Sequence, residues 1–418
     1  MELHSNINDI MFQRTLEKTI HVISESFPVL MLTGARQVGK TTLLEMCAQG
    51  RRAYVTLDDL DARNLAQSDP ALFLQTWKPP LIIDEIQYAP QLFSAIKVIV
   101  DREKRNGLFW LTGSQKFHLM RGITESLAGR VAIVDLLGLS QAEMSGRAES
   151  SRPFVPTPEW IAQARPSATG GSGQLMAVYQ RIWLGSFPRL VEQGPAARNL
   201  FYRSYIQTYI QRDVQDVLKV SDQLAFNRFL GAVAARTGQL LNYASLARDV
   251  EIDNKTAKSW LSILEASGLV YLLQPYHRNL TKRLVKTPKL YFLDTGLAAY
   301  LTKWPDPASL EAGSMSGALR ETWLLAEILK SYWHNGLEAS LYFYRDTDQR
   351  EVDLIIESGD TLYPVEFKKT ASPSVGASRQ FAVLDKLGKT VGHGAVLCFV
   401  EHALPLSAGV TAVPVGYL

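Results

Sequence analysis

The sequence lacks the features of an exported protein, of a membrane protein and of a protein that is stabilised by cysteine-bound zinc. Among its 418 residues only two are cysteines, Cys47 and Cys398, so neither a disulfide framework nor a cysteine-rich zinc site fits within one chain. No run approaches the ~20 consecutive apolar residues needed to cross a bilayer, and residues 1–10 do not form a secretion signal. We therefore expect a cytoplasmic protein with no membrane partner.

A strong excess of charge of either sign is also missing. The 44 Lys and Arg residues nearly balance the 41 Asp and Glu residues, and the net charge of +3 neither requires nor excludes a nucleic-acid partner. Hydrophobic residues make up 46% and charged residues 20% of the chain, as in folded soluble domains. At roughly 100–200 residues per domain, the length predicts two to four domains.

The first third of the chain alternates short apolar runs with amphipathic stretches. The runs are rich in β-branched and aromatic residues, as buried strands are. They cover residues 28–34, 52–59, 80–85, 107–114 and 130–136. This rhythm predicts an α/β fold in which a parallel sheet carries helices on both faces.

The rest of the chain predicts further units. Residues 145–174 are rich in Ser, Pro, Gly and Arg, and we expect no regular structure and high mobility there. Helical periodicity covers residues 175–220, and residues 225–273 predict three helices followed by a strand. Beyond residue 304 the pattern predicts one helix near residues 319–333 and three strands near residues 341–344, 351–357 and 361–368.

Residues 34–41, GARQVGKT, match the phosphate-binding loop G-x-x-x-x-G-K-[ST]. An apolar strand precedes the loop and a helical stretch follows it, which is the context that this loop requires. Backbone N–H groups surround the phosphates of ATP, Lys40 reaches the β- and γ-phosphates, and the Thr41 hydroxyl binds Mg²⁺. The residues expected to bind ATP are Gly34, Ala35, Arg36, Gln37, Val38, Gly39, Lys40, Thr41 and Thr42.

Two carboxylates follow the apolar residues 81–83. A buried strand would carry Asp84 and Glu85 to the edge of the sheet beside the phosphate loop. Asp84 is expected to hold the Mg²⁺ shell, and Glu85 is expected to activate water as a general base for ATP hydrolysis. The simpler alternative is that both carboxylates only cap a helix that begins at Ile86.

Two more segments reach the predicted sheet. The run over residues 107–114 ends in Ser114, which is followed by Gln115. Either residue is placed to report the γ-phosphate, unless the segment is an ordinary polar turn. Arg130 precedes the fifth run and acts either on the γ-phosphate of a neighbouring subunit, in a homo-oligomer, or in a surface ion pair.

At these residues the sequence resembles the AAA-type ATPases, specifically a large prokaryotic family of predicted ATPases whose loop reads GARQVGKTT. The resemblance includes residues 209–214, YIQRDV, and 287–297, TPKLYFLDTGL, and runs through nearly the whole chain. It implies core strand order 5-1-4-3-2, with Arg212 either a lid arginine or a structural helix charge. The implied domains are a P-loop ATPase core at 1–138, a helical lid at 139–220, a winged helix at 221–303 and a domain similar to restriction endonucleases at 304–418.

The middle of the chain predicts a helix, a turn and a second helix at residues 240–250 and 254–265. Lys255 and Lys258 lie on the first turns of the second helix, where side chains that read bases are usually displayed. Residues 277–289 carry five Lys or Arg residues and no acidic residue, which fits a wing that contacts phosphates. We expect a DNA partner, although winged helices also serve as protein-contact modules.

The C-terminal third contains the pattern D-x(12)-E-x-K, formed by Asp353, Glu366 and Lys368. Alternation along a strand places Glu366 and Lys368 on the same face. The pattern resembles the endonuclease-like core, in which two carboxylates hold a divalent metal, Mg²⁺ or Mn²⁺, and the lysine stabilises charge at phosphate. Glu321 matches the additional acid of that family and is expected to converge on the same metal. Ordinary ion pairs, or a retained fold without cleavage activity, are the alternatives.

These motifs predict an ATPase that acts on or responds to DNA, with branched DNA as one candidate, through the winged helix and the nuclease-like domain. The second hypothesis is a nucleotide switch. In that case ATP controls the docking of a protein partner, and there is no DNA chemistry.

Overall fold

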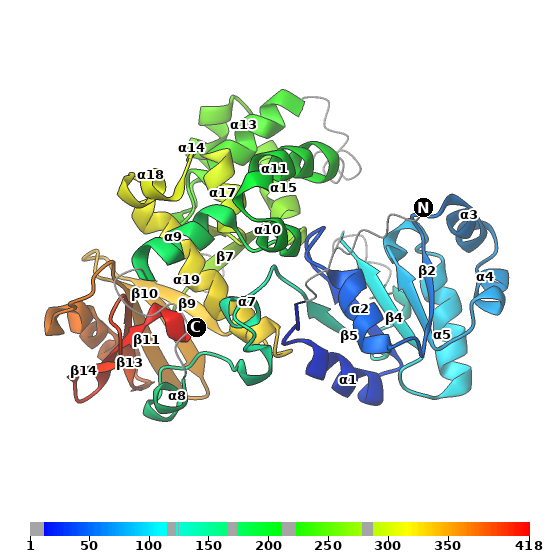
Figure 1. Cartoon of the computed structure of the whole chain (residues 1–418), viewed down its shortest axis with the longest axis horizontal. Helices are drawn as coiled ribbons and strands as arrows, with labels where there is room; N and C mark the ends of the chain where they lie inside the picture. The colour runs from blue at the N-terminus through cyan, green and yellow to red at the C-terminus, as the bar shows by residue number, and fades with distance from the viewer. Residues whose placement is uncertain (1–11, 115–122, 124, 165–173, 211–222, 278–286) are drawn as a thin grey trace, which may run out of the picture.

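The computed structural model describes residues 12–114, 123, 125–164, 174–210, 223–277 and 287–418. Figure 1 shows an N-terminal α/β unit, in blue and cyan, beside a larger unit that contains the remaining helices and a second sheet. In these ranges no helix combines the length and apolar character that a membrane span needs.

The N-terminal unit contains a parallel sheet. Its strands are β1 (Val29–Thr33), β2 (Ala53–Thr56), β3 (Leu81–Asp84), β4 (Phe109–Gly113) and β5 (Val131–Asp135). They lie in the order β2-β3-β4-β1-β5, and each pairing is parallel. The predicted parallel sheet is confirmed, and its order agrees with the one that the family resemblance implies.

The inner strands β1, β3 and β4 are apolar because they are buried on both faces. Leu30 and Leu32 of β1 enter one core, and Val29 and Met31 enter another. Two helices cover the first face, α1 (Glu17–Ser26) and α2 (Lys40–Ala48). Three helices cover the second, α3 (Leu60–Ser68), α4 (Pro70–Thr76) and α5 (Leu92–Glu103).

The segment after β5 has more regular structure than expected. It forms α7 (Gln141–Met144), the 3-10 turn η2 (Ala148–Ser150) and α8 (Pro158–Gln163). Phe154 is fully buried, and its ring meets Trp160 edge-on with 4.8 Å between centroids. The expectation of no regular structure over 145–174 is therefore wrong for η2 and α8, because aromatic anchors override a loop-like composition. Residues 165–173 lie outside the described residues.

The middle of the chain combines helices with short antiparallel strands. It begins with α9 (Gln174–Leu184), α10 (Pro188–Gln193) and α11 (Arg198–Tyr205). The elements that follow are α13 (Gln223–Ala234), β6 (Gln239–Leu240), α14 (Tyr243–Val250), α15 (Asn254–Ala266), β7 (Val270–Pro275) and β8 (Lys289–Phe292). Strand β8 pairs antiparallel with both β6 and β7. The predicted three helices and strand are confirmed.

The last part of the chain completes a mixed sheet. Helices α17 (Thr295–Leu301), α18 (Pro307–Ala312) and α19 (Ser316–Trp333) precede β9 (Leu341–Arg345), β10 (Glu351–Ser358), β11 (Thr361–Phe367), β12 (Thr390–Val391), β13 (Gly394–Cys398), β14 (Leu404–Ser407) and β15 (Val410–Pro414). The strands lie in the order β14-β15-β13-β11-β10-β9-β7-β8-β6, with β12 beside β11. The predicted helix and strands are confirmed.

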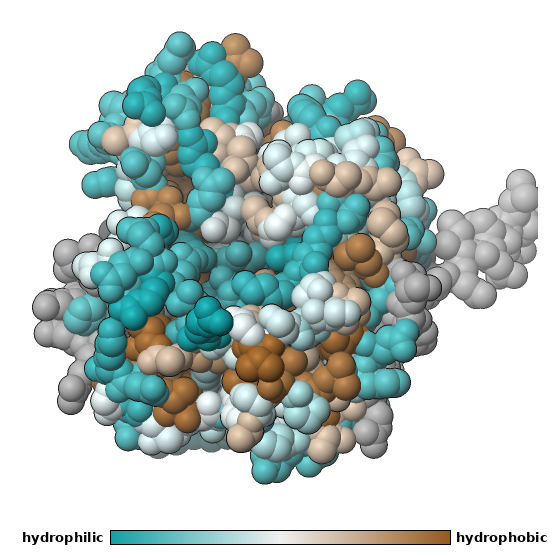
Figure 2. All heavy atoms as spheres, turned by 90° about the vertical axis from the view of Figure 1, so that its left-hand side faces the viewer, coloured by the Kyte–Doolittle hydropathy of each residue, from teal (hydrophilic) through white to brown (hydrophobic). Residues whose placement is uncertain are grey.

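One parallel pairing joins the two later parts of the chain. Gln274 and Pro275 of β7 face Tyr342 and Phe343 of β9. The segments 221–303 and 304–418 therefore share one continuous sheet. Figure 2 shows the outer face of this larger unit, with hydrophilic residues over much of its upper part and hydrophobic residues gathered in its lower half.

Candidate functional site

Glycine geometry shapes the phosphate loop between β1 and α2. Gly34 has a φ of 144°, and a Cβ atom there would lie 2.1 Å from Leu136 O, so a larger residue would clash. Gly39 has a φ of 91° and is the N-cap of α2. Helix α2 thus begins at Lys40, and its free amides and dipole lie at the loop, as an anion site requires.

Lys40 and Thr41 supply the two side chains that an ATP–Mg²⁺ site needs. The Lys40 ammonium is buried in the curve of the loop and donates to Gly34 O at 3.0 Å and Ala35 O at 2.9 Å. The Thr41 hydroxyl donates to Asp84 Oδ1 at 2.8 Å. The loop and the last residue of β3 therefore meet at the carboxyl edge of the sheet.

Hydroxyl groups hold Asp84 in place. Thr112, in β4, donates to Oδ1, while Tyr54 and Thr56 of β2 donate to Oδ2 at 3.4 and 3.5 Å. The carboxylate is buried and faces the Thr41 hydroxyl. Carboxylate and hydroxyl oxygens are hard ligands that fit Mg²⁺.

Glu85 turns sharply away from the line of β3. Its φ is 55°, an uncommon value for a residue with a side chain. Its amide donates to Thr112 Oγ1 at 3.2 Å, and its Oε2 accepts from Ser114 at 3.4 Å and from Gln87. These contacts hold the carboxylate beside the end of β4, whose neighbour β1 carries the phosphate loop.

Arg130 lies at the other end of the parallel strands, where they begin. It directly precedes β5, and its carbonyl accepts from the amide of Val29, the first residue of β1. Its Nε and Nη2 atoms donate to Oδ1 and Oδ2 of Asp101, on α5, at 2.6 and 3.1 Å. Within its own chain Arg130 is therefore a surface ion-pair residue, about one strand length from the loop. Its role toward a neighbouring subunit stays a prediction.

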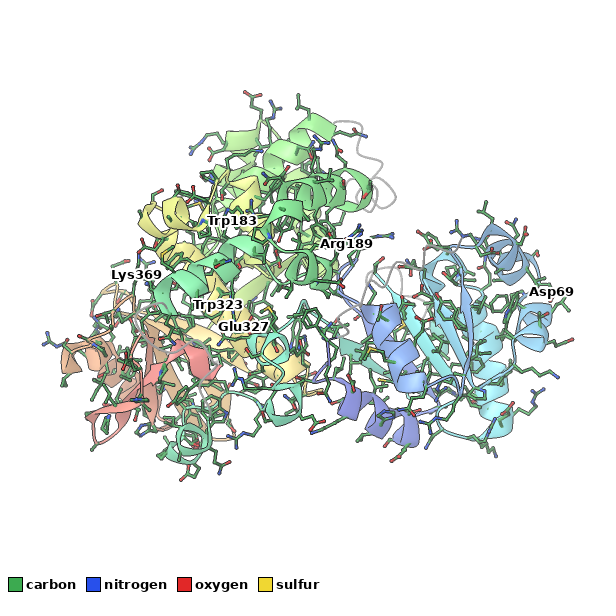
Figure 3. The ribbon with its side chains drawn as sticks, in the orientation of Figure 1. Asp69, Trp183, Arg189, Trp323, Glu327 and Lys369 are labelled. Carbon is green, nitrogen blue, oxygen red and sulfur yellow. The ribbon has the colours of Figure 1, made fainter. Side chains whose placement is uncertain are left out.

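Helix α10 brings a different arginine toward the loop. The Pro188 ring lies 3.9 Å from the position that a Cβ atom would take at Gly39. Arg189 follows and is exposed, and Figure 3 shows it on the side of the larger unit that faces the N-terminal unit. Arg212, the predicted lid arginine, lies outside the described residues, as does Gln115.

Buried Arg14 ties the loop to the larger unit. Its Nη1 donates to Val38 O at 2.8 Å, and its Nη2 donates to Leu137 O at 2.7 Å. Its Nε lies 3.2 Å from Glu143 Oε1 of α7. The same oxygen lies 3.1 Å from Nδ1 of His334, just after α19, and the Leu137 amide donates to His334 Nε2 at 3.2 Å. A chain of buried polar contacts therefore joins the loop to α19.

Burial and charge decide the protonation states in this cluster. Burial acts to raise the pKa of Glu143, but Arg14 and His334 lower it far below its usual value. Burial lowers the pKa of His334, so the ring is neutral near pH 7. A neutral ring agrees with an Nε2 atom that accepts a hydrogen bond.

A second buried pair strengthens the same junction. Glu327 Oε1, on α19, accepts from Lys330 at 2.8 Å, and its Oε2 accepts from the Gln141 amide at 2.6 Å. Lys330 also donates to Leu139 O at 2.9 Å. Figure 3 shows Glu327 beside the short helix α7. Helix α19 is thus anchored to the segment that follows the nucleotide-site sheet.

Asp353 and Glu366 meet on the second sheet. The antiparallel register pairs Leu354 with Val365, which sets the two carboxylates opposite each other at the next position. The Phe367 amide donates to Asp353 Oδ2 at 2.9 Å, and Lys368 donates to Glu366 Oε1 at 2.7 Å. Glu366 is 6% exposed, and its Oε2 receives no well-formed hydrogen bond from the residues that the structure describes.

Burial raises the pKa values of both carboxyl groups. The charge of Glu366 raises the pKa of Asp353 further. Burial also raises the pKa of Glu366, against the opposing effect of its contact with Lys368. Burial acts to lower the pKa of Lys368, but that contact raises it. Two buried carboxylates that repel each other are stabilised by a proton or by a divalent cation between them.

Glu321 does not complete this pair. Its Oε1 accepts from the Tyr291 hydroxyl at 2.5 Å and from Lys289 at 3.2 Å, and Lys289 also pairs with Glu351 at 2.5 Å. Across the described ranges no group of three or more His, Cys, Asp or Glu side chains is placed to hold a metal ion. In this arrangement buried Lys289 attracts the Glu321 carboxylate, and the convergence of Glu321 on one metal with the other two acids stays a prediction.

Comparison with known proteins assigns the N-terminal unit. Residues 26–145 match the AAA domain family, while residues 176–308 and 316–418 match two domains of unknown function, DUF8612 and DUF4143. The uncharacterized proteins Rv2008c of Mycobacterium tuberculosis and Mb2031c of Mycobacterium bovis are each 31% identical over 395 residues, covering 93% of this chain and 80% of theirs. The chain belongs to their family. Its N-terminal unit is an ATPase domain of the AAA type.

Two solved structures give weaker likenesses. The Walker-type ATPase PABY2304 of Pyrococcus abyssi is 15% identical, covers 71% of this chain and 97% of its own, and has a TM-score of 0.45. A single-residue variant of RuvB from Thermotoga maritima is 16% identical, covers 61% and 88%, and has a TM-score of 0.29.

The AAA-type site of this family member contains residues that the sequence analysis missed. Thr112 joins Asp84 to the Glu85 amide, and its position two residues before Ser114 on a predicted strand was a usable signal. Arg14 offered no such signal, because 24 residues separate it from Val38. Nothing in its local sequence indicates that contact.

Proposed function

We propose that this AAA-type protein hydrolyses ATP with Mg²⁺ and uses its nucleotide state to act on DNA. The observation that carries the ATPase proposal is the meeting of Lys40, Thr41, Asp84 and Glu85 at one sheet edge. Lys40 would bind the β- and γ-phosphates, and Thr41 and Asp84 would hold the metal. Mg²⁺ there would neutralise charge that develops on the phosphate oxygens.

Glu85 would orient the attacking water and accept its proton. Its Oε2 already accepts hydrogen bonds from Ser114 and Gln87, so its position is fixed before substrate arrives. A fixed acceptor needs little reorganisation during the reaction. Ser114 would respond to the γ-phosphate through its contact with Glu85.

Three contacts support a link between the nucleotide state and the larger unit. Arg14 binds the loop carbonyl of Val38, and Pro188 lies against Gly39. A Cβ atom at Gly268, in the turn between α15 and β7, would lie 3.5 Å from Ala35 N. A rearrangement of the loop on ATP binding would therefore be transmitted to α10, to α15 and, through Glu143, to α19.

The middle unit offers a surface for DNA. The order α13-β6-α14-α15-β7-β8, with β8 paired to both neighbours, supports a winged helix. Trp260 packs against Phe226 and Phe229 on one side of α15, while Lys255 and Lys258 are exposed. Four of the five predicted wing cations, Arg278, Lys282, Arg283 and Lys286, lie outside the described residues.

The second sheet would supply a nuclease-like site with two metal ligands. Asp353 and Glu366 are the carboxylates that fit Mg²⁺ or Mn²⁺, and Lys368 is in contact with Glu366. The chemistry would be attack of water on a phosphodiester, with Lys368 offsetting charge on the phosphate. The alternative, metal-dependent DNA binding without cleavage, would use the same residues.

ATP turnover with and without DNA tests this function. We expect duplex, single-stranded or branched DNA to raise kcat, and the double variant Lys255→Glu and Lys258→Glu to reduce that stimulation at unchanged basal turnover. The charge-matched control is Arg102→Glu with Lys386→Glu, two exposed cations elsewhere. No stimulation by any of the three DNA forms would favour a switch that docks a protein partner.

A further inference from the structure

A cavity in the larger unit has a wall of cations and aromatic rings. It measures about 460 Å³ and lies between the start of α11, the end of α17 and the loop before α18. Arg198, Arg203, Tyr300, Lys303 and Trp304 line it, and none of its lining residues is acidic. No motif in the sequence pointed to it, and the nucleotide and carboxylate sites use none of these residues.

Arg198 is a buried cation that the fold holds rigidly. It is 2% exposed, and its Nε and Nη2 donate to Trp183 O at 2.7 Å and Gly296 O at 3.3 Å. Its guanidinium lies over the Trp183 ring, 4.1 Å from the centroid. Figure 3 shows Trp183 within the helical part of the larger unit. The position of the charge is therefore set before any ligand binds.

The charge of Arg198 is only partly balanced. No carboxylate of the described chain forms an ion pair with it; Nη1 donates to the amide oxygen of Asn199 at 3.3 Å. Asp294 attracts it from a longer distance. That carboxylate already accepts from Tyr202 at 2.9 Å and from the Ser186 amide at 2.7 Å. A buried cation without a close anion is costly, and an anionic ligand would lower that cost.

The rest of the wall also offers donors and rings. Arg203 and Lys303 are exposed cations at its rim, and the Lys303 ammonium lies 5.4 Å from the centroid of the Tyr300 ring. The Trp304 Nε1 atom is buried and finds no acceptor among the described residues. Cationic donors suit a phosphate, and Tyr300 and Trp304 offer rings on which a base can stack.

Helix α18 links the cavity to the second sheet. Helix α18 begins two residues after Pro305 and has six residues, a length of about 9 Å. At its far end, a Cβ atom at Gly313 would lie 2.1 Å from the Trp304 ring, and Lys369 donates to Glu311 O at 2.8 Å. Lys369 directly follows Lys368 of the carboxylate site. These contacts join the cavity wall, through α18, to the residue that follows Lys368.

We propose that this cavity binds a phosphate of a single-stranded nucleic acid, with the adjacent base against Tyr300 and Trp304. The inference rests on the proposed DNA function and deepens it, because it assigns a second contact point that is separate from α15. Arg198 would be the fixed anchor, and Arg203 and Lys303 would close over the phosphate from the rim.

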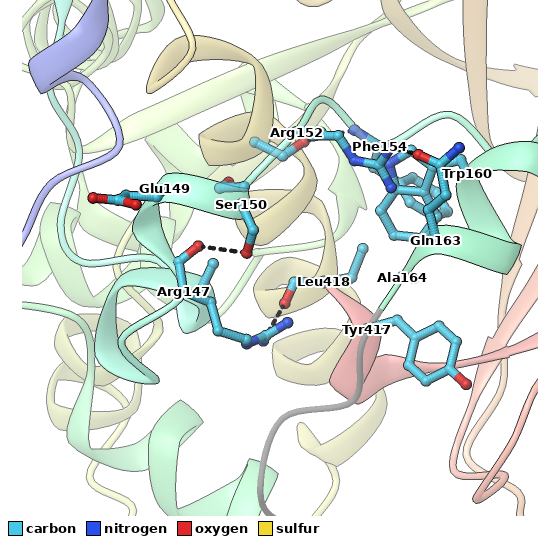
Figure 4. Close-up of a pocket in the computed structure, with 13 residues that line it drawn as sticks. Arg147, Glu149, Ser150, Arg152, Phe154, Trp160, Gln163, Ala164, Tyr417 and Leu418 are labelled. Atoms are coloured by element: carbon cyan, nitrogen blue, oxygen red, sulfur yellow. Dashed lines mark hydrogen bonds between the residues drawn. The ribbon is translucent and has the colours of Figure 1, made fainter.

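Another cavity, drawn in Figure 4, is less informative. It measures about 320 Å³ and includes Arg147, Arg152 and Trp160. Arg147 already donates to Leu418 O at 3.3 Å, and Arg152 bonds to Gln163. Neither cation is fully buried, whereas Arg198 is.

Binding of a fluorescently labelled oligo(dT) strand to the full chain tests the proposal. For Arg203→Ala with Lys303→Ala we expect about tenfold weaker binding and a shallower salt dependence, by roughly 0.7 log–log units per lost phosphate contact. Arg102→Ala with Lys386→Ala, the matched control, should change neither quantity. Trp304→Phe should weaken binding without changing the salt slope, since it alters stacking and not charge.

Three outcomes would overturn the proposal, and they are distinguishable. If the wild type binds oligo(dT) and the rim variant binds equally well, the cavity fails while the DNA function stands. If the wild type binds no DNA of any form, both fail. If inorganic phosphate or a poly-glutamate peptide binds in a way that depends on Arg203 and Lys303, but oligo(dT) does not, the cavity is a site for free anions or acidic peptides.

Discussion

The two acidic sites of this protein differ in how their carboxylates are held. At the nucleotide site, Asp84 receives hydroxyl groups from the loop helix and from two neighbouring strands, so its charge is solvated by the protein itself. On the second sheet, burial raises the pKa values of Asp353 and Glu366, and the charge of Glu366 raises the pKa of Asp353 further. Lys368 donates a hydrogen bond to Glu366. The carboxylate of the first site is therefore held in place by hydrogen bonds within the protein, whereas a proton or a divalent cation between the two carboxylates would stabilise the second.

Helix α19 stands between these sites. Its C-terminal part is bonded to the segment that supports the phosphate loop, through Glu327, Lys330 and His334. Its first turns carry Glu321, which contacts Lys289 near the second sheet. One helix therefore contacts the surroundings of both sites, and substitutions can show whether the two sites are energetically coupled.

The largest expected effect is on ATP turnover at the nucleotide site. Glu85→Gln should lower kcat for ATP by about 10²–10⁴-fold with nucleotide binding retained, because it removes the proposed general base. Lys40→Ala should instead abolish productive binding, because it removes the phosphate contact. Measured by steady-state turnover and by titration with a fluorescent ATP analogue, equal loss of nucleotide affinity in both variants would count against the role of Glu85.

Substitution of Glu143 should have the next largest effect, on stability. Glu143→Gln leaves the Arg14 charge buried and unpaired, which we expect to lower the free energy of unfolding by about 3–5 kcal/mol. Urea denaturation at pH 7 measures it, and exposed Glu338→Gln is the control. A loss below about 1 kcal/mol, which is the range of surface pairs, would show that the cluster does not anchor α19.

Substitution of an acid on the second sheet should raise the free energy of unfolding, whereas substitution of Glu143 should lower it. Asp353→Asn removes one of two repelling carboxylates, so without divalent metal at pH 8 we expect a gain of about 1–3 kcal/mol in the free energy of unfolding. Mg²⁺ or Mn²⁺ should raise the Tm of the wild type but not of this variant, whereas exposed Asp348→Asn should behave like the wild type. A destabilised D353N protein would mean that its bond to the Phe367 amide outweighs the repulsion.

Much of this contrast could be predicted from the sequence. The phosphate loop and the apolar strand before Asp84 have local signatures, and alternation predicted one shared face for Glu366 and Lys368, which are in contact. The network of Arg14, Glu143 and His334 could not be predicted, because it depends on the packing of segments more than 100 residues apart. For Glu321, the match of spacing gave no sign of Lys289, which attracts its carboxylate.

The smallest effect is a difference in the pH dependence of stability. Burial lowers the pKa of His334, so its contribution is present above the unfolded value of about 6.5 and is lost as pH falls below it. The raised pKa values of Asp353 and Glu366 act the other way, since protonation relieves their repulsion. In an Asp353→Asn background, lowering the pH from 7.5 to 5.5 should therefore destabilise the protein by about 1 kcal/mol. Adding His334→Asn should flatten this slope, while exposed His402→Asn should not. If His334→Asn left the slope unchanged, the ring would take up a proton as readily in the folded as in the unfolded state, which a nitrogen that accepts the Leu137 hydrogen bond should prevent.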